Sequence, residues 1–300
     1  MDNKEKLMII AKIFGGLGNQ MFQYAMARSL SADKLLPLLL DTSWYQSTGN
    51  ATSRDFELPL FSFETREAKK RAVDKLTKHR FSRLVNSTEK IFKKKISLPS
   101  SYIKEPHFHY WSGITSVPES CYLEGYWQSP RYFEKNKDII KGDFIFPDIS
   151  DSLNLSYYRK IRAEENAVCL HVRRGDYVSN AVTNAFHGCC SMEYYGDAVA
   201  YLSPLITKPH YFIFSDDPEW ALQNFNLEKM TVVTGNSGKN AFRDMQLMTY
   251  CKHHILANSS FSWWGAWLKE YQGITIAPAR WFKGAEYKTD DLYLDGWIKI

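Results

Sequence analysis

The segment 7–41 constrains the fold most, because it reads as a strand, a glycine-rich turn, a helix and a second strand in succession. Residues 7–14 form an apolar run, and three glycines follow within residues 15–20. The pattern then predicts a helix over 21–34 and a buried strand over 35–41. A strand, a helix and a further strand in this order are typical of the start of a parallel sheet.

The second half of the chain repeats this alternation after a linker-like stretch at 146–151. The apolar runs predict strands at 167–171, 211–214, 230–233, 254–257 and 274–277, and helices at 191–203, 218–224, 240–251 and 262–269. The first half also predicts basic helices within 65–95, an irregular stretch at 96–120, a strand at 122–126 and a helix at 130–141. We therefore predict two α/β domains, at 1–150 and 151–300, the first with a basic helical insertion.

Polar residues follow the strand predicted at 167–171 at once, in the order His171-Val172-Arg173-Arg174-Gly175-Asp176-Tyr177. Ligands of open α/β sheets bind beyond the carboxyl ends of the strands. The planar guanidinium fork of arginine suits phosphate, because it donates two parallel charge-assisted hydrogen bonds. The two arginines therefore indicate a site for a phosphorylated ligand. The alternative is a surface loop whose arginines pair with nearby carboxylates.

Four further motifs accompany this one: Ile13–Ala25 (IFGGLGNQMFQYA), Gly125–Ser129 (GYWQS), Phe214–Asp217 (FSDD) and Asn258–Leu268 (NSSFSWWGAWL). In this order the five motifs resemble the bacterial α-1,2-fucosyltransferases of glycosyltransferase family 11. The resemblance extends over residues 13–268. It implies a GT-B-like fold, in which two Rossmann-like domains face a cleft, with 1–150 on the acceptor side and 151–300 binding GDP-fucose.

The resemblance implies an inverting enzyme that moves L-fucose from GDP-β-L-fucose to the 2-OH of a terminal β-galactose. Arg173 then stabilises the charge that grows on the leaving β-phosphate, while Arg174 binds this phosphate or braces the loop. Asp176 is the candidate for the base that accepts the hydroxyl proton. The related α-1,6-fucosyltransferases imply that His171 and Asp244 read guanine. The alternative for His171 is a structural histidine at a strand end. The alternatives for Asp244 are a salt bridge with Arg243 and a charge on a helix surface.

The motif after the strand at 254–257 opens a helix, and its backbone N–H groups and hydroxyls suit the donor pyrophosphate. Its candidate donor-binding residues are Asn258, Ser259, Ser260 and Phe261.

The first domain supplies further candidates. Gly16 and Gly18 permit close approach of a donor to the backbone. The resemblance assigns Asn19 a catalytic role, in which it holds the donor phosphate or the acceptor. Trp127 and Gln128 are candidates for the acceptor wall, with core packing as the alternative.

Other functions stay open at this point. A fucosyltransferase of another linkage or acceptor is the alternative within the family. An NAD-type oxidoreductase would use the first glycine loop and Asp41, although the G-x-G-x-x-G spacing that starts at Gly16 fails at Met21. A non-catalytic sugar-binding protein would use the aromatic residues, which make up 15% of the chain. A nucleic-acid binder would use residues 66–95, whose twelve Lys and Arg outnumber three acidic residues; a local excess favours an anionic surface or ligand instead.

We expect no cofactor, because GDP-fucose is a co-substrate, and no metal, because the chain has no Asp-x-Asp pair at a strand end. The five cysteines are an odd number without disulfide or metal spacing, which favours a reducing compartment. The sequence has no signal-peptide core and no apolar run of about 20 residues. We therefore expect a soluble cytoplasmic protein. The basic segment 66–95 suggests a peripheral contact with anionic lipid headgroups at the inner face of the membrane, with a solvated helical face as the alternative.

Overall fold

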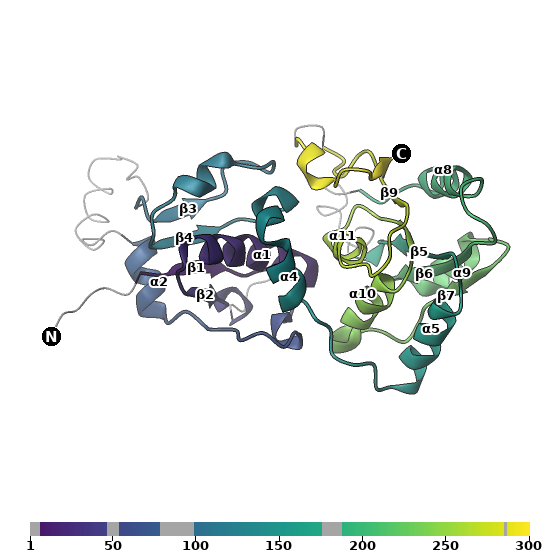
Figure 1. Ribbon diagram of the computed structural model, residues 1–300, viewed down its shortest axis with the longest axis horizontal. Helices are drawn as coiled ribbons and strands as arrows, with labels where there is room; N and C mark the ends of the chain where they lie inside the picture. The colour runs from purple at the N-terminus through teal and green to yellow at the C-terminus, as the bar shows by residue number, and fades with distance from the viewer. Residues whose placement is uncertain (1–6, 47–53, 79–98, 176–187, 285–286) are drawn as a thin grey trace. The chain divides into compact units, whose positions relative to one another are not determined.

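The computed structural model describes residues 7–46, 54–78, 99–175, 188–284 and 287–300. The chain divides into two compact units, Met1–Ile145 and Phe146–Ile300. Each unit contains a parallel sheet accompanied by helices (Figure 1). The predicted fold class of two Rossmann-like α/β domains is thereby confirmed.

The described part of the first unit contains a four-stranded sheet in the order β2-β1-β4-β3, with every pairing parallel. Its strands are β1 (Ile9–Lys12), β2 (Leu38–Asp41), β3 (Tyr102–Lys104) and β4 (Cys121–Glu124). Its α-helices are α1 (Leu17–Lys34), α2 (Lys70–Thr77) and α4 (Lys137–Asp143). Its 3-10 helices are η1 (Ser43–Gln46), η2 (Leu58–Leu60), η3 (Ser112–Ser116), η4 (Pro130–Tyr132) and η5 (Glu134–Asn136).

Helix α1 begins earlier than the sequence pattern predicts, inside the glycine-rich segment. Gly15 has a φ of +80°, a left-handed conformation that glycine adopts without a steric penalty, and Gly16 is the N-cap. At the other end, Leu35 caps the helix with a φ of 55° and is 91% exposed. Leu35 therefore ends the helix and does not start β2, which begins at Leu38.

The second unit contains a six-stranded sheet in the order β10-β9-β8-β5-β6-β7, again parallel throughout. Its strands are β5 (Ala167–Val172), β6 (His210–Ser215), β7 (Met230–Val232), β8 (His253–Ile255), β9 (Thr275–Ala277) and β10 (Ile298–Lys299). Its α-helices are α5 (Ser152–Arg162), α8 (Met192–Leu202), α9 (Pro218–Asn224), α10 (Phe242–Thr249) and α11 (Ser260–Trp267). Two 3-10 helices, η6 (Gly238–Asn240) and η7 (Asp290–Leu292), complete the described elements.

Strand β5 is central, and all six of its residues are buried. Since side chains alternate along a strand, Val168 and Leu170 pack with α8 on one face, while Cys169 packs with α5 and α10 on the other. Helix α11 carries three tryptophans, Trp263, Trp264 and Trp267, and all three are buried in the core.

Among the described α-helices and strands, α5, β3 and β10 were not predicted from the sequence, and one predicted helix is wrong in its extent. Helix α5 buries only Asn154, Tyr157 and Ile161, and its Leu153 is 43% exposed, so its apolar residues do not form one buried stripe. Strands β3 and β10 have three and two residues, too few for an alternating pattern. The helix predicted at 130–141 is replaced by η4, η5 and α4.

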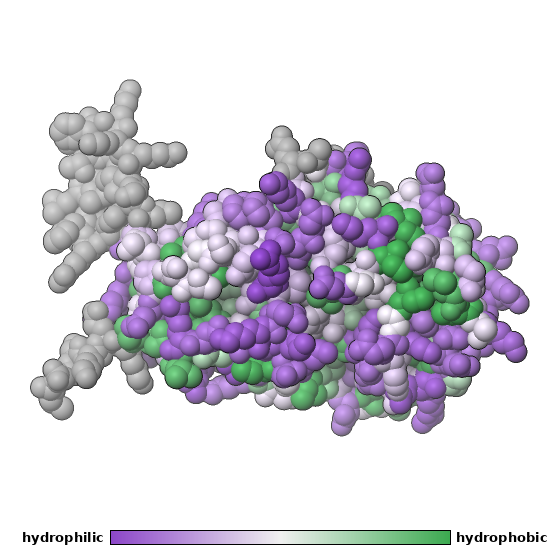
Figure 2. Space-filling model, turned by 45° about the horizontal axis from the view of Figure 1, so that its top comes forward, coloured by the Kyte–Doolittle hydropathy of each residue, from purple (hydrophilic) through white to green (hydrophobic). Residues whose placement is uncertain are grey.

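Hydrophilic side chains cover most of the described surface on the face drawn in Figure 2. Within the described ranges, no helix combines the length and the apolar character that a membrane crossing requires.

Candidate active site

Three neighbouring strands of the second unit end in polar residues. Strand β5 pairs in parallel with β6 on one side and with β8 on the other, so their carboxyl ends lie at the same edge of the sheet. This edge is where open α/β sheets bind ligands. The polar residues that follow these strands are Arg173 and Arg174 after β5, Asp216 and Asp217 after β6, and Asn258, Ser259 and Ser260 after β8.

Asp216 holds both the side chain of Arg173 and the loop after β5. Its Oδ2 lies 2.8 Å from Nη1 of Arg173, and its Oδ1 accepts a hydrogen bond of 2.8 Å from the backbone N–H of Arg174. A Cβ on Gly175 would come within 2.5 Å of Oδ2 of Asp216, so a larger residue there would disturb this contact. Charge-assisted hydrogen bonds of this kind fix the direction of the guanidinium fork.

Arg174 makes contacts that brace the site. Its Nε lies 3.3 Å from Oδ2 of Asp217, and its guanidinium lies 4.0 Å from the centroid of the Trp220 ring. Asp217 in turn caps α9, because its Oδ1 accepts a 3.1 Å hydrogen bond from the backbone N–H of Trp220. These contacts support the bracing role for Arg174 over direct phosphate binding.

His171 is 5% exposed and, by alternation along β5, points to the face that α10 covers. Its Nδ1 has no hydrogen-bond partner among the described residues. Burial lowers the pKa of His171 to about 3; the charge of Asp216 opposes this shift and that of Arg173 adds to it. The imidazole is therefore neutral near pH 7.

Asp244 lies in the first turn of α10 and accepts a 2.8 Å hydrogen bond from Nδ2 of Asn236. The side-chain amides of Asn236 and Asn154 also bind each other, with Asn236 donating at 2.8 Å and Asn154 donating at 2.9 Å. This pair holds the Asn236 amide that donates to Asp244. Burial raises the pKa of Asp244 to about 7, against the lowering effect of the Asn236 hydrogen bond. The neighbouring Arg243 donates instead to the backbone carbonyl of Pro147 at 2.8 Å, so the salt bridge considered as an alternative does not form.

The segment after β8 is fixed by its own side chains. Asn258 is buried and donates from Nδ2 to the carbonyls of Gly188 and Trp281 at 3.0 and 3.2 Å. Oγ of Ser259 caps α11 by accepting a 3.3 Å hydrogen bond from the N–H of Phe261. Asn258 thus positions this helix start, while the backbone of the first turn is the part suited to an anion.

The first unit brings two predicted residues together at the carboxyl ends of its strands. Nε2 of Gln128 donates a 2.7 Å hydrogen bond to Oδ1 of Asn19, in the first turn of α1. Gly16 caps this helix and Gly18 is buried within its first turn. The four residues lie in the first unit, whereas the predicted phosphate and guanine residues lie in the second.

Trp127, a predicted acceptor residue, is only 1% exposed and has a φ of 56°. Its ring therefore belongs to the core, the alternative that the sequence left open. The neighbouring Tyr126 is 45% exposed, and its ring meets that of Phe14 edge-on at 4.9 Å. Tyr126 is thus the aromatic residue of this motif that a ligand can reach.

Glu105, which no sequence pattern singled out, clamps this motif from the end of β3. Its carboxylate accepts hydrogen bonds from the backbone N–H groups of Tyr126 and Trp127 at 2.6 and 3.0 Å. A Cβ on Gly125 would lie 2.3 Å from Cβ of Glu105, so this close approach requires glycine. Burial raises the pKa of Glu105 to about 7, although the two backbone hydrogen bonds oppose the shift.

Asp176, the predicted base, lies outside the described residues. The described ranges contain no group of three His, Cys, Asp or Glu side chains that could hold a metal ion.

Comparisons with a family model, with curated proteins and with solved structures each found similar proteins. The model of Glycosyl transferase family 11 matches residues 8–300. An alpha-1,2-colitosyltransferase from Escherichia coli is 34% identical over 297 residues, with 98% of this chain and 99% of the relative covered. The O-antigen biosynthesis glycosyltransferase WbnK from Escherichia coli is 34% identical over 300 residues, with 95% and 98% covered. Galactoside alpha-(1,2)-fucosyltransferase 1 from Leontocebus fuscicollis is 24% identical over 192 residues, 59% of this chain and 52% of the relative. Among solved structures, the fucosyltransferase NodZ from Bradyrhizobium gives a TM-score of 0.47 at 13% identity, with 89% of this chain and 94% of that chain covered.

Proposed function

Because the chain belongs to glycosyltransferase family 11, we propose that it transfers L-fucose from GDP-β-L-fucose to the 2-OH of a terminal β-galactose, giving an α-1,2-fucoside with inversion. The observation that carries the proposal is the Arg173 guanidinium, held by Asp216 at the carboxyl end of β5. A likeness to an α-1,2-fucosyltransferase over part of the chain also supports it.

In this mechanism Arg173 acts on the leaving group. Negative charge grows on the β-phosphate as the bond to the sugar breaks, and a positioned guanidinium stabilises this charge most in the transition state. A guanidinium has five N–H donors, so Arg173 is able to keep its contact with Asp216 while it binds phosphate. The N-terminal turn of α11 supplies further backbone N–H groups for the pyrophosphate.

Guanine recognition is proposed for Asp244 and His171. An ionised Asp244 is able to accept hydrogen bonds from the N1–H and N2–H₂ groups of guanine, a pair of donors that adenine lacks. Asn236 fixes the orientation of this carboxylate at 2.8 Å. His171 lies on the same face of the sheet and has a buried Nδ1 for which the described residues provide no partner.

Acceptor recognition is proposed for the motif 125–129 of the first unit. The exposed ring of Tyr126 offers an apolar face to a galactose ring, while the hydrogen-bonded amides of Gln128 and Asn19 offer polar groups to its hydroxyls. Asp176 remains our proposal for the base, since it directly follows the loop that Asp216 holds.

The similarity to an alpha-1,2-colitosyltransferase, which is 34% identical over nearly the whole chain, suggests GDP-colitose as a second candidate donor. Colitose is fucose without its 3-hydroxyl group. A site that hydrogen-bonds this hydroxyl would discriminate strongly against colitose, whereas an apolar contact there would not. The alternative is therefore a colitosyltransferase with the same phosphate and guanine contacts.

The proposal is tested with the purified full chain, GDP-fucose or GDP-colitose as donor, and lactose or a β-1,3-linked galactoside as acceptor. We expect an α-1,2-linked fucoside, identified by NMR of the product. Faster turnover of GDP-colitose than of GDP-fucose would identify colitose as the transferred sugar. The proposed roles of the phosphate and guanine contacts would then stay the same. Transfer to a different hydroxyl would give another linkage.

A thermal-shift screen with GDP, NADH and oligonucleotides separates the remaining function classes. We expect stabilisation by GDP alone. Stabilisation by NADH without GDP would favour the oxidoreductase, although Asp41, the residue expected to bind ribose there, is buried and accepts a 2.7 Å hydrogen bond from Tyr122. Binding of galactosides without any nucleotide would favour a non-catalytic sugar-binding protein.

A further inference from the structure

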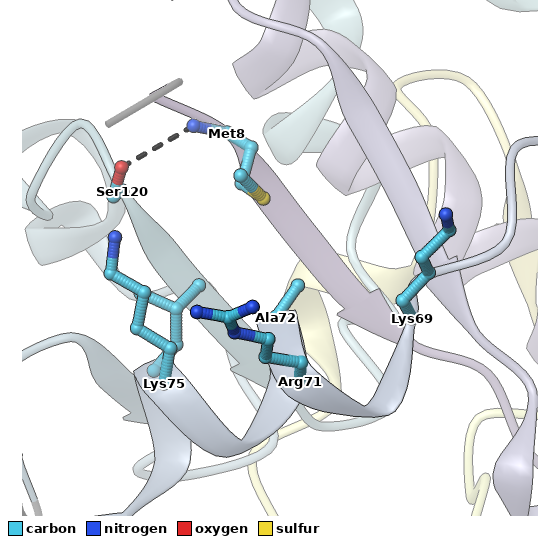
Figure 3. Close-up of a pocket in the computed structure, with 7 residues that line it drawn as sticks. Met8, Lys69, Arg71, Ala72, Lys75 and Ser120 are labelled. Atoms are coloured by element: carbon cyan, nitrogen blue, oxygen red, sulfur yellow. Dashed lines mark hydrogen bonds between the residues drawn. The ribbon is translucent and has the colours of Figure 1, made fainter. Parts of the chain in front are cut away.

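The first unit contains a pocket of about 270 Å³ beneath helix α2, apart from the residues discussed above. Six of its lining residues are labelled in Figure 3: Met8, Lys69, Arg71, Ala72, Lys75 and Ser120. A seventh, Leu76, is buried and packs with Ile10 and Tyr122 in a small apolar core. The pocket therefore has an apolar base that is continuous with the core of the unit.

The charges at this pocket are all positive. Lys69, the N-cap of α2, and Arg71 and Lys75 within this helix are exposed, and the structure describes no carboxylate in contact with Lys69 or Arg71. Arg71 and Lys75 project from the side of α2 that faces Met8 and Ser120 (Figure 3). Oγ of Ser120 accepts a 3.3 Å hydrogen bond from the backbone N–H of Met8, which connects the two residues that line the pocket opposite α2.

An apolar pocket with a cationic rim matches a ligand that has an anionic head and an apolar chain. Pockets of this kind gain affinity from apolar lining and orientation from a few polar groups. A free phosphate would make no use of Met8, Ala72 and Leu76. A nucleobase would leave its polar edge unsatisfied against them, which is costly.

We propose that this pocket binds an anionic phospholipid of a membrane surface, with the phosphate at Arg71 and Lys75 and the first methylene groups of the chain between Met8 and Ala72. Basic residues beside an anionic bilayer are attracted to its headgroups, and salt weakens this attraction. The apolar pocket adds a contact that a merely basic surface lacks. The site would hold the first unit at the membrane while the chain remains outside it.

The first test uses octyl phosphate below its micelle concentration as a soluble probe of the full chain. The methyl group of Met8, labelled with ¹³C, reports on the pocket by NMR. We expect a saturable shift of this signal with octyl phosphate and at least tenfold weaker binding of inorganic phosphate. An unchanged Met8 signal, or equal affinity for the two probes, would overturn the proposal.

The second test uses co-sedimentation with vesicles of phosphatidylglycerol or of phosphatidylcholine. We expect binding to phosphatidylglycerol at low salt and a loss of about tenfold or more in Arg71→Ser/Lys75→Ser. Ala72→Phe keeps every charge but fills the pocket, so it should weaken both octyl phosphate and vesicle binding. Lys135→Ser/Lys137→Ser removes two charges elsewhere in the same unit and should bind like the wild type.

Thermal unfolding of each variant separates misfolding from loss of the site. A folded Ala72→Phe protein that binds vesicles normally would show that surface charge alone acts, and would overturn the pocket proposal. Equal losses in the Lys135→Ser/Lys137→Ser control would overturn it as well. Transferase activity enters neither test, so failure here leaves the proposed function untouched.

Discussion

Nη1 of Arg173 lies 2.8 Å from Oδ2 of Asp216, so two adjacent parallel strands are joined by an ion pair just beyond their carboxyl ends. The same carboxylate holds the backbone of Arg174, and the side chain of Arg174 rests on Trp220. Arg173 and Arg174 are thus held in place by contacts within the protein. Such preorganisation spares a site the cost of ordering its charged groups during the reaction.

Replacing Arg173 with Lys should cost roughly 2–4 kcal/mol of transition-state stabilisation, which slows the reaction about 30-fold to 900-fold. Lysine keeps the charge but lacks the fork that binds Asp216 and phosphate together. The change should appear mainly in kcat at saturating donor. Arg162→Lys, a cation exposed on α5, is the matched control. Wild-type turnover in Arg173→Lys would remove Arg173 from the leaving-group role.

We expect Asp244 to make donor affinity depend on pH. Burial raises the pKa of its carboxyl to about 7, so the group gains a proton below this value and then cannot accept two hydrogen bonds from guanine. GDP affinity should therefore rise as the pH increases from 6 to 8, as measured by calorimetry. Asp244→Asn should bind GDP more weakly and lose this dependence, with a smaller preference for GDP over ADP. If Asp244→Asn is folded and binds GDP as tightly as the wild type, Asp244 does not bind guanine.

Tyr126 and its neighbour should respond to substitution in opposite ways. Tyr126→Ala removes an exposed ring and should raise the KM for the acceptor while leaving the melting temperature and GDP affinity nearly unchanged. Trp127→Ala removes a buried ring and should destabilise the fold by about 3–5 kcal/mol. Steady-state kinetics and thermal unfolding distinguish the two effects. An unaltered acceptor KM in Tyr126→Ala would contradict the acceptor role of the motif.

Removal of divalent metal ions by a chelator should leave the turnover rate unchanged. In the proposed mechanism, Arg173 and the first turn of α11 supply the positive potential at the pyrophosphate. Turnover is compared in buffer with EDTA and in buffer with Mg²⁺ or Mn²⁺. Activity that is lost in EDTA and restored by either ion would show that a metal ion helps to stabilise the leaving phosphate, the role assigned to Arg173 alone.

The sequence predicts best where a site follows directly from a local pattern. An apolar strand that ends in two arginines predicts both β5 and the position of Arg173, because the polar loop after a buried parallel strand lies at the sheet edge. The partner Asp216 lies in a motif noted from the sequence, but its pairing depends on the register of β5 with β6. A resemblance, and no periodicity, pointed to Asp244.

Glu105 shows why other parts of the site were not predicted. It follows β3, which has three residues and no alternating pattern. Its contacts with Tyr126 and Trp127 arise because β3 pairs with β4 at long range. The same reason applies to Asn236, which reaches Asp244 from the loop after β7. Contacts that form only when distant strands pair produce no local pattern in the sequence, so they cannot be predicted from it.

The clamp of Glu105 on the motif 125–129 also limits how this enzyme could be redesigned. Gly125 and Glu105 form one steric unit, and the left-handed backbone of Trp127 depends on the hydrogen bond that Glu105 accepts. A library aimed at new acceptor glycans should therefore vary Tyr126 and keep these three residues unchanged. Homologous enzymes that exchange acceptors by recombination should inherit the end of β3 and this motif together, although 19 residues separate Glu105 from Gly125.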